Sequence, residues 1–190
     1  MQIFWPVVGI LTVAAITLGP NNAIVMAHAA SDGLSRAILS ILVIAASSVV
    51  LAVIAFAAVD LLFAPPASDW LAIAGAAALL VMAIGLWRAA GKPHGATEHR
   101  ARDLLGLMVF QLVNAKGWIM MAIVAAQLPP NLSEAMPTLA AIPLVTGACL
   151  TVWAAGGAFL QRFIASARAR ANFDRAIAAL LGCFALMLLA

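Results

Sequence analysis

The sequence predicts an all-helical membrane protein with six membrane-spanning helices. Of its 190 residues, 66% are hydrophobic and 9% are charged, whereas a soluble globular domain has about 25% charged residues. The apolar residues form six long runs, and short segments that contain most of the charges separate them. A chain of this length has room for six spans of about 20 residues with short loops. We therefore expect a single transmembrane domain over residues 1–190.

Each predicted span is an apolar run bounded by charged or turn-forming residues. The first run should remain as a span, because no Lys or Arg precedes Arg36 and a cleavable signal needs a positive start. The last run is short, so we expect its helix to begin about a turn earlier, near Asn172. The runs are Ile3–Ala27, Ala37–Val59, Trp70–Trp87, Leu104–Leu128, Leu139–Leu160 and Ala176–Ala190.

The basic residues predict how the spans are oriented. Short loops that contain Lys and Arg stay on the cytoplasmic side, and here the first, third and fifth loops are basic while the second and fourth are not. Both termini should therefore lie outside. The same distribution explains the net charge of +3 without nucleic-acid binding. The basic residues are Arg36 in the first loop, Arg88, Lys92, Arg100 and Arg102 in the third, and Arg162, Arg168, Arg170 and Arg175 in the fifth.

The central basic loop divides the chain into two halves of similar length. Residues 3–87 and 104–190 each contain three predicted spans, and the cytoplasmic loop 88–103 joins them. With three spans per half, the second half enters the membrane from the opposite side. This arrangement is typical of the inverted-topology repeats of secondary transporters.

Polar residues interrupt the first span at Gly19, Pro20, Asn21 and Asn22. Pro20 cannot donate a backbone hydrogen bond and clashes with the preceding turn, and the asparagines follow where a new helix would be capped. One interpretation is a tolerated proline kink whose amides bond neighbouring helices. The other is a discontinuous helix whose second half points its free N–H groups and positive dipole end at a binding site.

The fourth span has its own interruption, with Gln111, Asn114 and Lys116. Lys116 lies roughly 19 Å along a helix from Asp103, and Asn22 roughly 15 Å from Asp32, which places both near the middle of the bilayer. A lysine there costs about 2.5–3.5 kcal/mol on the insertion scale and needs a partner, a wet cavity or a side chain that reaches the interface. No acidic residue is expected at this depth, because all seven lie at or near the predicted loops.

Together the two interruptions suggest a binding site for an anion. On a continuous helix Asn114 and Lys116 are about 200° apart, so they can line one cavity only if the helix loosens. A half-helix N-terminus and a lysine are both positive, and the nearby amides are neutral. We therefore expect a substrate carboxylate at this site, with the amides binding an amino group. The candidate binding residues are Gly19, Pro20, Asn21, Asn22, Gln111, Asn114 and Lys116.

Little in the sequence suggests an enzyme, a cofactor or a metal site. It contains no nucleophile and base pair, phosphate loop or paired carboxylates. Cys149 and Cys183 lie in apolar runs, where they should be buried, and His94 and His99 lack further ligands at suitable spacing. His28 is either a solvated interfacial residue or a proton relay.

Several motifs resemble the LysE/RhtB superfamily of bacterial amino-acid exporters over essentially the whole chain. They are "GPNN" followed by Gly33 and Arg36, "GLWRA" before the basic loop, "FQLVNAKGW", and "VWAAGGAFLQRF". These motifs are most similar to those of the branch that exports cysteine and O-acetylserine. Two family prolines are missing, since Leu18 and Ala115 stand in their places.

The resemblance implies export of a small neutral amino acid or close metabolite across the bacterial cytoplasmic (inner) membrane. It also implies six spans, a homodimer and coupling to the proton gradient. From the two halves we expect transport by alternating access, and we expect no cofactor. Two alternatives remain: a cation or metal exporter of the same superfamily, and a membrane protein that does not transport.

Overall fold

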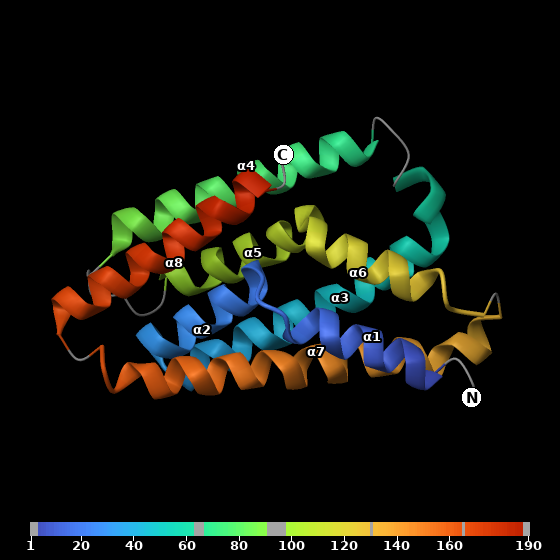
Figure 1. The fold of residues 1–190 in the computed structure, drawn as a ribbon, viewed down its shortest axis with the longest axis horizontal. Coiled ribbons are helices and arrows are strands. Elements are labelled where there is room, and N and C mark those ends of the chain that lie inside the picture. The colour runs from blue at the N-terminus through green and yellow to red at the C-terminus, as the bar shows by residue number, and fades with distance from the viewer. Residues whose placement is uncertain (1–3, 63–66, 91–97, 130, 165, 188–190) are drawn as a thin grey trace.

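The computed structural model describes residues 4–62, 67–90, 98–129, 131–164 and 166–187. Within these ranges the regular structure is entirely α-helical (Figure 1), which confirms the predicted all-helical class. The helices are α1 (Phe4–Ile16), α2 (Pro20–Asp32), α3 (Leu34–Leu62), α4 (Ala67–Ala89), α5 (Glu98–Val113), α6 (Ala115–Ala125), α7 (Leu132–Gln161) and α8 (Ala167–Met187).

Helices long and apolar enough to cross a membrane occur in both halves of the chain. In the described residues, Leu34–Ala57 of α3 and Leu132–Gln161 of α7 each meet this criterion. Two further spans result if α1 with α2, and α5 with α6, are each taken as one bent helix. The apolar part of α4, Ala72–Arg88, is shorter. The structure thus supports two to four spans, and the arrangement of six spans in two repeats stays a prediction.

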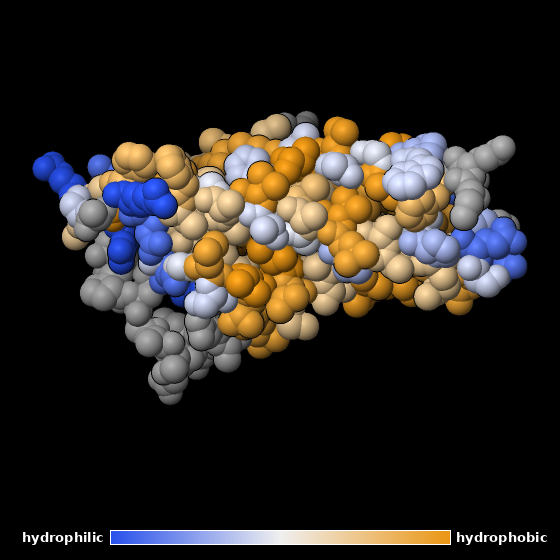
Figure 2. All heavy atoms as spheres, turned by 90° about the horizontal axis from the view of Figure 1, so that it is seen from below, coloured by the Kyte–Doolittle hydropathy of each residue, from blue (hydrophilic) through white to orange (hydrophobic). Residues whose placement is uncertain are grey.

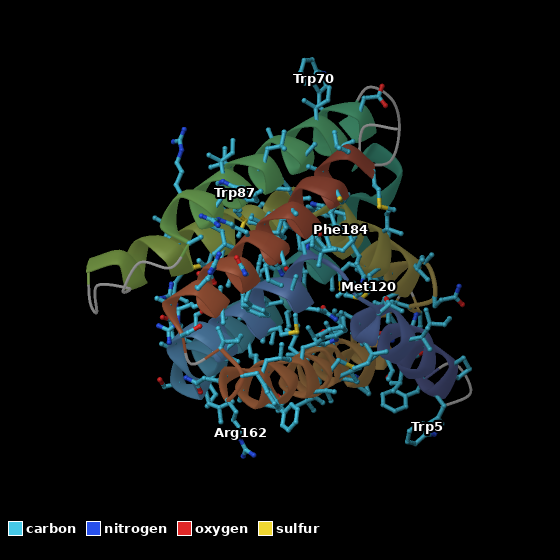
Figure 3. All side chains as sticks on the ribbon, turned by 60° about the vertical axis from the view of Figure 1, so that its left-hand side comes forward. Trp5, Trp70, Trp87, Met120, Arg162 and Phe184 are labelled. Atoms are coloured by element: carbon cyan, nitrogen blue, oxygen red, sulfur yellow. The ribbon has the colours of Figure 1, made fainter. Side chains whose placement is uncertain are left out.

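The outer surface of the bundle is apolar, as expected for a protein surrounded by lipid. Leu144 and Val81 are 73% and 71% exposed, and a soluble protein rarely exposes so many large hydrophobic side chains together. Figure 2 shows apolar residues over the middle of one face and hydrophilic residues toward its ends. Trp5 and Trp70, in the first turns of α1 and α4, project from the bundle in Figure 3, as interfacial tryptophans do.

Some predicted boundaries and burials are wrong. Helix α7 already begins at Leu132 and so includes Pro137, which was expected in a loop; the Asn131 side chain caps it by accepting a hydrogen bond from the Ser133 N–H at 3.0 Å. Helix α8 begins at Ala167, ahead of the expected Asn172. Cys149 is buried as expected but Cys183 is exposed, because α8 presents part of its surface to the outside of the bundle.

Helices α3 and α7 are long, unbroken helices that contact each other, and α7 runs along the edge of the bundle opposite α4 and α8 (Figure 1). Helix α7 packs against both parts of the first bent helix, α1 and α2, and α3 packs against both parts of the second, α5 and α6. Helices α4 and α8 run side by side along one edge of this arrangement (Figure 1). Helices α3 and α7 therefore each contact both parts of a broken helix from the opposite half of the chain.

The hydrophobic core is split into two clusters. One contains Ile44, Phe110 and Leu150, and the other contains Leu51 and Ile142. Along α3 and α7 the polar residues Ser48 and Thr146 lie between the members of these two clusters, at the level where the bent helices break. The middle of the bundle is therefore polar, with apolar packing on either side of it.

The contact between α2 and α7 depends on Gly157. A Cβ atom there would collide with the backbone oxygen of Met26 and lie 2.9 Å from the Ala29 Cβ. We expect Gly157→Ala to destabilise the protein by about 1–3 kcal/mol, as overpacking does, which lowers the melting temperature in detergent by several degrees. Gly156→Ala is the matched control, because no atom lies within 4 Å of a Cβ at Gly156. Equal melting temperatures for the two variants would contradict this packing.

Candidate functional site

The first break lies between α1 and α2, whose axes differ in direction by 57°. Pro20 is the first residue of α2, and Gly19 before it is fully extended, with φ −162° and ψ 177°. The break leaves carbonyl groups at the end of α1 without helical partners. The side-chain amide of Asn22 donates to the carbonyls of Ala15 at 3.0 Å and Thr17 at 3.1 Å. Asn22 thus stabilises the broken end of α1.

A second side chain, from a different helix, also donates a hydrogen bond to the end of α1. Trp153 of α7 donates its indole N–H to the carbonyl of Ile16 at 3.1 Å. This bond makes Trp153 part of the first break. Helix α7 therefore both packs against α1 and satisfies a carbonyl that the break exposes.

The second break, between α5 and α6, bends the chain by 58°. Asn114 alone leaves the helical conformation, and its side-chain oxygen caps α6 by accepting the Gly117 N–H at 3.4 Å. The amide of Asn114 donates to the side-chain oxygen of Gln111 at 3.1 Å, and both residues are buried. Trp118 donates to the carbonyl of Leu112 at 2.8 Å. The helix therefore breaks although no proline is present.

Lys116 connects the two breaks. Its ammonium group donates to the carbonyl oxygen of Thr17 at 2.6 Å and to the hydroxyl of Thr17 at 3.0 Å. This approach requires Gly19, because a Cβ there would lie 2.8 Å from the Lys116 Nζ. An ammonium group has three N–H donors, and these two bonds leave one for another acceptor. The loosening at Asn114 thus brings Lys116 to the same side as Asn114, as the predicted site requires.

A small polar cavity lies where the breaks meet. Its volume is about 30 Å³, room for about one water molecule, whereas pockets for small molecules usually measure about 300–1,000 Å³. The cavity is therefore too small in this structure to hold an amino acid. All seven predicted site residues line the cavity: Gly19, Pro20, Asn21, Asn22, Gln111, Asn114 and Lys116. The remaining lining residues are Ala14, Ala15, Ser48, Gly117, Met120, Thr146 and Leu150.

Two polar atoms in the cavity wall are buried without a hydrogen-bond partner in the described part of the chain. They are the side-chain oxygen of Asn21 and the hydroxyl oxygen of Thr146. A buried unsatisfied polar group costs about 1–3 kcal/mol, so such groups need an explanation. Because both atoms line the cavity, a ligand that carries N–H donors would satisfy them.

The cavity is electrically positive. Lys116 lines it together with the first turns of α2 and α6, and each helix N-terminus acts like about half a positive charge. No side chain caps α2. Among the acidic side chains that the structure describes, those of Asp32, Asp69, Glu134 and Asp174, none lines the cavity.

The sequence interpretation missed Thr17, Ser48 and Thr146. Ser48 and Thr146 were detectable as hydroxyl residues in the middle of apolar runs, whereas the partnership of Thr17 with Lys116 left no sequence signal. The expectation that every acidic residue lies at or near a loop is wrong for Asp174. This residue is 1% exposed inside α8, where it accepts a hydrogen bond from the Ser31 hydroxyl of α2 at 3.3 Å.

These features define a multi-pass helical membrane protein with a polar site at two broken helices. A family model described as LysE type translocator matches residues 12–190. The chain therefore belongs to the LysE type translocator family, which confirms the LysE/RhtB resemblance and makes the protein a member of a family of transporters rather than enzymes. No curated protein and no solved structure matches the chain. The cysteine and O-acetylserine branch and the homodimer stay predictions.

The two neighbouring asparagines should respond differently to substitution. Asn22→Ala removes the donor to two carbonyls of α1 and should cost about 1–3 kcal/mol, or roughly 2–12 °C in melting temperature. Asn21→Ala removes an oxygen that has no partner, so it should leave the melting temperature unchanged or higher while weakening substrate binding. Thermal unfolding of both purified variants tests this. Equal destabilisation by the two substitutions would contradict the assigned contacts.

Proposed function

We propose that this protein exports a small neutral amino acid and binds its carboxylate in the cavity between the two helix breaks. The observation that supports this most strongly is the position of Lys116. Its positive charge reaches the cavity beside the N-termini of two half-helices, and within the described residues its ammonium group donates to the neutral Thr17. The site therefore lacks an anion that a substrate carboxylate supplies.

The carboxylate takes the place of Thr17 as the acceptor for Lys116. A hydrogen bond between two charged groups is roughly twice as strong as one between neutral groups. Once the carboxylate is desolvated, Lys116 therefore binds it more strongly than it binds Thr17. The uncapped first turn of α2 supplies further N–H donors and a favourable dipole. Export requires that binding be reversible, and Thr17 offers Lys116 a partner when the substrate leaves.

The unpaired oxygens of Asn21 and Thr146 accept hydrogen bonds from the substrate amino group. They line the same cavity as Lys116, so one zwitterion satisfies all three groups. The cavity is small, and Ala14, Ala15, Met120 and Leu150 line it without further charged groups, which favours a short, neutral side chain. This chemistry agrees with the substrates of the cysteine and O-acetylserine branch that the sequence resembles.

Transport proceeds by alternating access of two inverted halves. A cavity of about 30 Å³ must widen to admit an amino acid, and the breaks provide flexible points at matching positions in the two halves. The similar bends of 57° and 58° and the reciprocal packing of α3 and α7 support the repeat.

The described arginines near helix ends indicate the orientation. Arg36, Arg88 and Arg162 lie where α3 begins and where α4 and α7 end, which is one end of the bundle. We place this end in the cytoplasm of a bacterial cell and the protein in its inner membrane. Both termini then lie outside. A cation exporter is not favoured, because the charge that lines the cavity is positive.

Substitution of Lys116 tests the proposal. In membrane vesicles, Lys116→Met should reduce amino-acid transport at least tenfold, because the substituted side chain has no charge for the carboxylate, and Lys116→Arg should retain part of the activity. Arg162→Gln is the control, since it removes an exposed positive charge that does not line the cavity. Full transport by folded Lys116→Met would refute a carboxylate site at this residue.

A further inference from the structure

A second cavity lies between α4 and α8, at the arginine-rich end of the bundle. Its volume is about 220 Å³, and it shares no lining residue with the polar cavity. Figure 3 labels Trp87, one of its residues, where α4 runs beside α8. We call it the α4–α8 groove. It is lined by Ala83, Ile84, Trp87 and Arg88 of α4 and by Ala178 and Ala179 of α8.

Arginine and tryptophan lie together at one end of this groove. The guanidinium carbon of Arg175 is 5.7 Å from the centre of the Trp87 ring, a distance at which a cation is attracted to an aromatic face. Arg88, in the last turn of α4, lines the groove directly. Two arginines from different helices, one lining the groove and one over the ring of half-exposed Trp87, thus lie at this end, where arginine and tryptophan are typical of the level of the lipid headgroups.

The rest of the groove is apolar. Ala83 and Ala178 are small and buried, and Ile84 is half exposed at the edge. These residues lie one turn farther from the helix ends than Arg88 and Arg175 do, which is toward the middle of the bilayer. A volume of 220 Å³ equals about seven water molecules at about 30 Å³ each, and suits a segment of a hydrocarbon chain.

We propose that the α4–α8 groove binds an anionic phospholipid. Its phosphate contacts Arg88 and Arg175, and part of an acyl chain occupies the apolar portion. Basic pockets between membrane helices on the cytoplasmic side bind such headgroups, and this order of charge, tryptophan and apolar surface matches the order of groups along a lipid. The site is independent of the substrate cavity.

The charge of the groove argues against two other occupants. A symmetric contact between two copies over this surface would bring the arginines of both copies together, which is unfavourable. A free phosphate would use the arginines but leave the apolar portion uncovered. An anionic lipid satisfies both parts.

Lipid binding to the full-length protein in detergent tests this inference. Native mass spectrometry should detect phosphatidylglycerol bound with at least tenfold higher affinity than phosphatidylcholine. The double variant Arg88→Gln and Arg175→Gln should lose this preference. The control is Arg162→Gln, which removes a similar arginine contact, 5.8 Å from the Phe159 ring, outside the groove and should keep the preference. Melting temperatures in lipid-free detergent verify that the variants fold.

Each other outcome overturns the proposal. If the two lipids bind equally, or if the folded double variant keeps the preference for phosphatidylglycerol, the groove does not bind an anionic lipid. Full competition by glycerol phosphate identifies a site for phosphate alone. A change from dimer to monomer in the double variant, with lipid preference unchanged, identifies the groove as an interface between copies.

Discussion

The hydrogen bonds between Lys116 and Thr17 connect the two places where the helices of this protein break. Inside a bilayer each unsatisfied backbone group costs several kcal/mol, so a helix can break only where other groups satisfy its free ends. Here Asn22, Trp153 and Lys116 supply donors to the end of α1. Since two of these residues come from the second half of the chain, the first break depends on the packing of both halves.

The same constraint explains why the site is polar and positive. Breaking α1 from α2 and α5 from α6 turns two helix N-termini toward the middle of the bundle, and Lys116 adds a full charge there. Thr17 neutralises none of this charge. It only provides an acceptor, which leaves the charge of Lys116 available for the carboxylate that we propose as its ligand. The unpaired oxygens of Asn21 and Thr146 add hydrogen-bond acceptors to this positive site. A site with a cation and free acceptors is complementary to a zwitterion.

Local sequence signals predicted much of this arrangement. The apolar runs predicted helices, Pro20 marked the first break, and Lys116 near Asn114 marked the second although Ala115 replaces a proline. The partners across the bundle were not predictable, because nothing in the sequence near Trp153 or Thr17 indicates which distant atom each will meet. Ser48 and Thr146 both carry a hydroxyl group within an apolar run, yet Ser48 donates to the carbonyl of Ile44 in its own helix, while Thr146 has no partner among the described residues. The sequence around the two residues does not predict this difference.

An experimental structure of the protein with a bound small amino acid would show whether Lys116 binds the substrate carboxylate. The substrate carboxylate should lie within hydrogen-bond distance of the Lys116 Nζ and the first turn of α2, with Lys116 released from Thr17. The amino group should contact Asn21 or Thr146. Two results would contradict a carboxylate site at Lys116: a bound amino acid that leaves the hydrogen bonds between Lys116 and Thr17 intact, or one whose amino group lies beside Lys116.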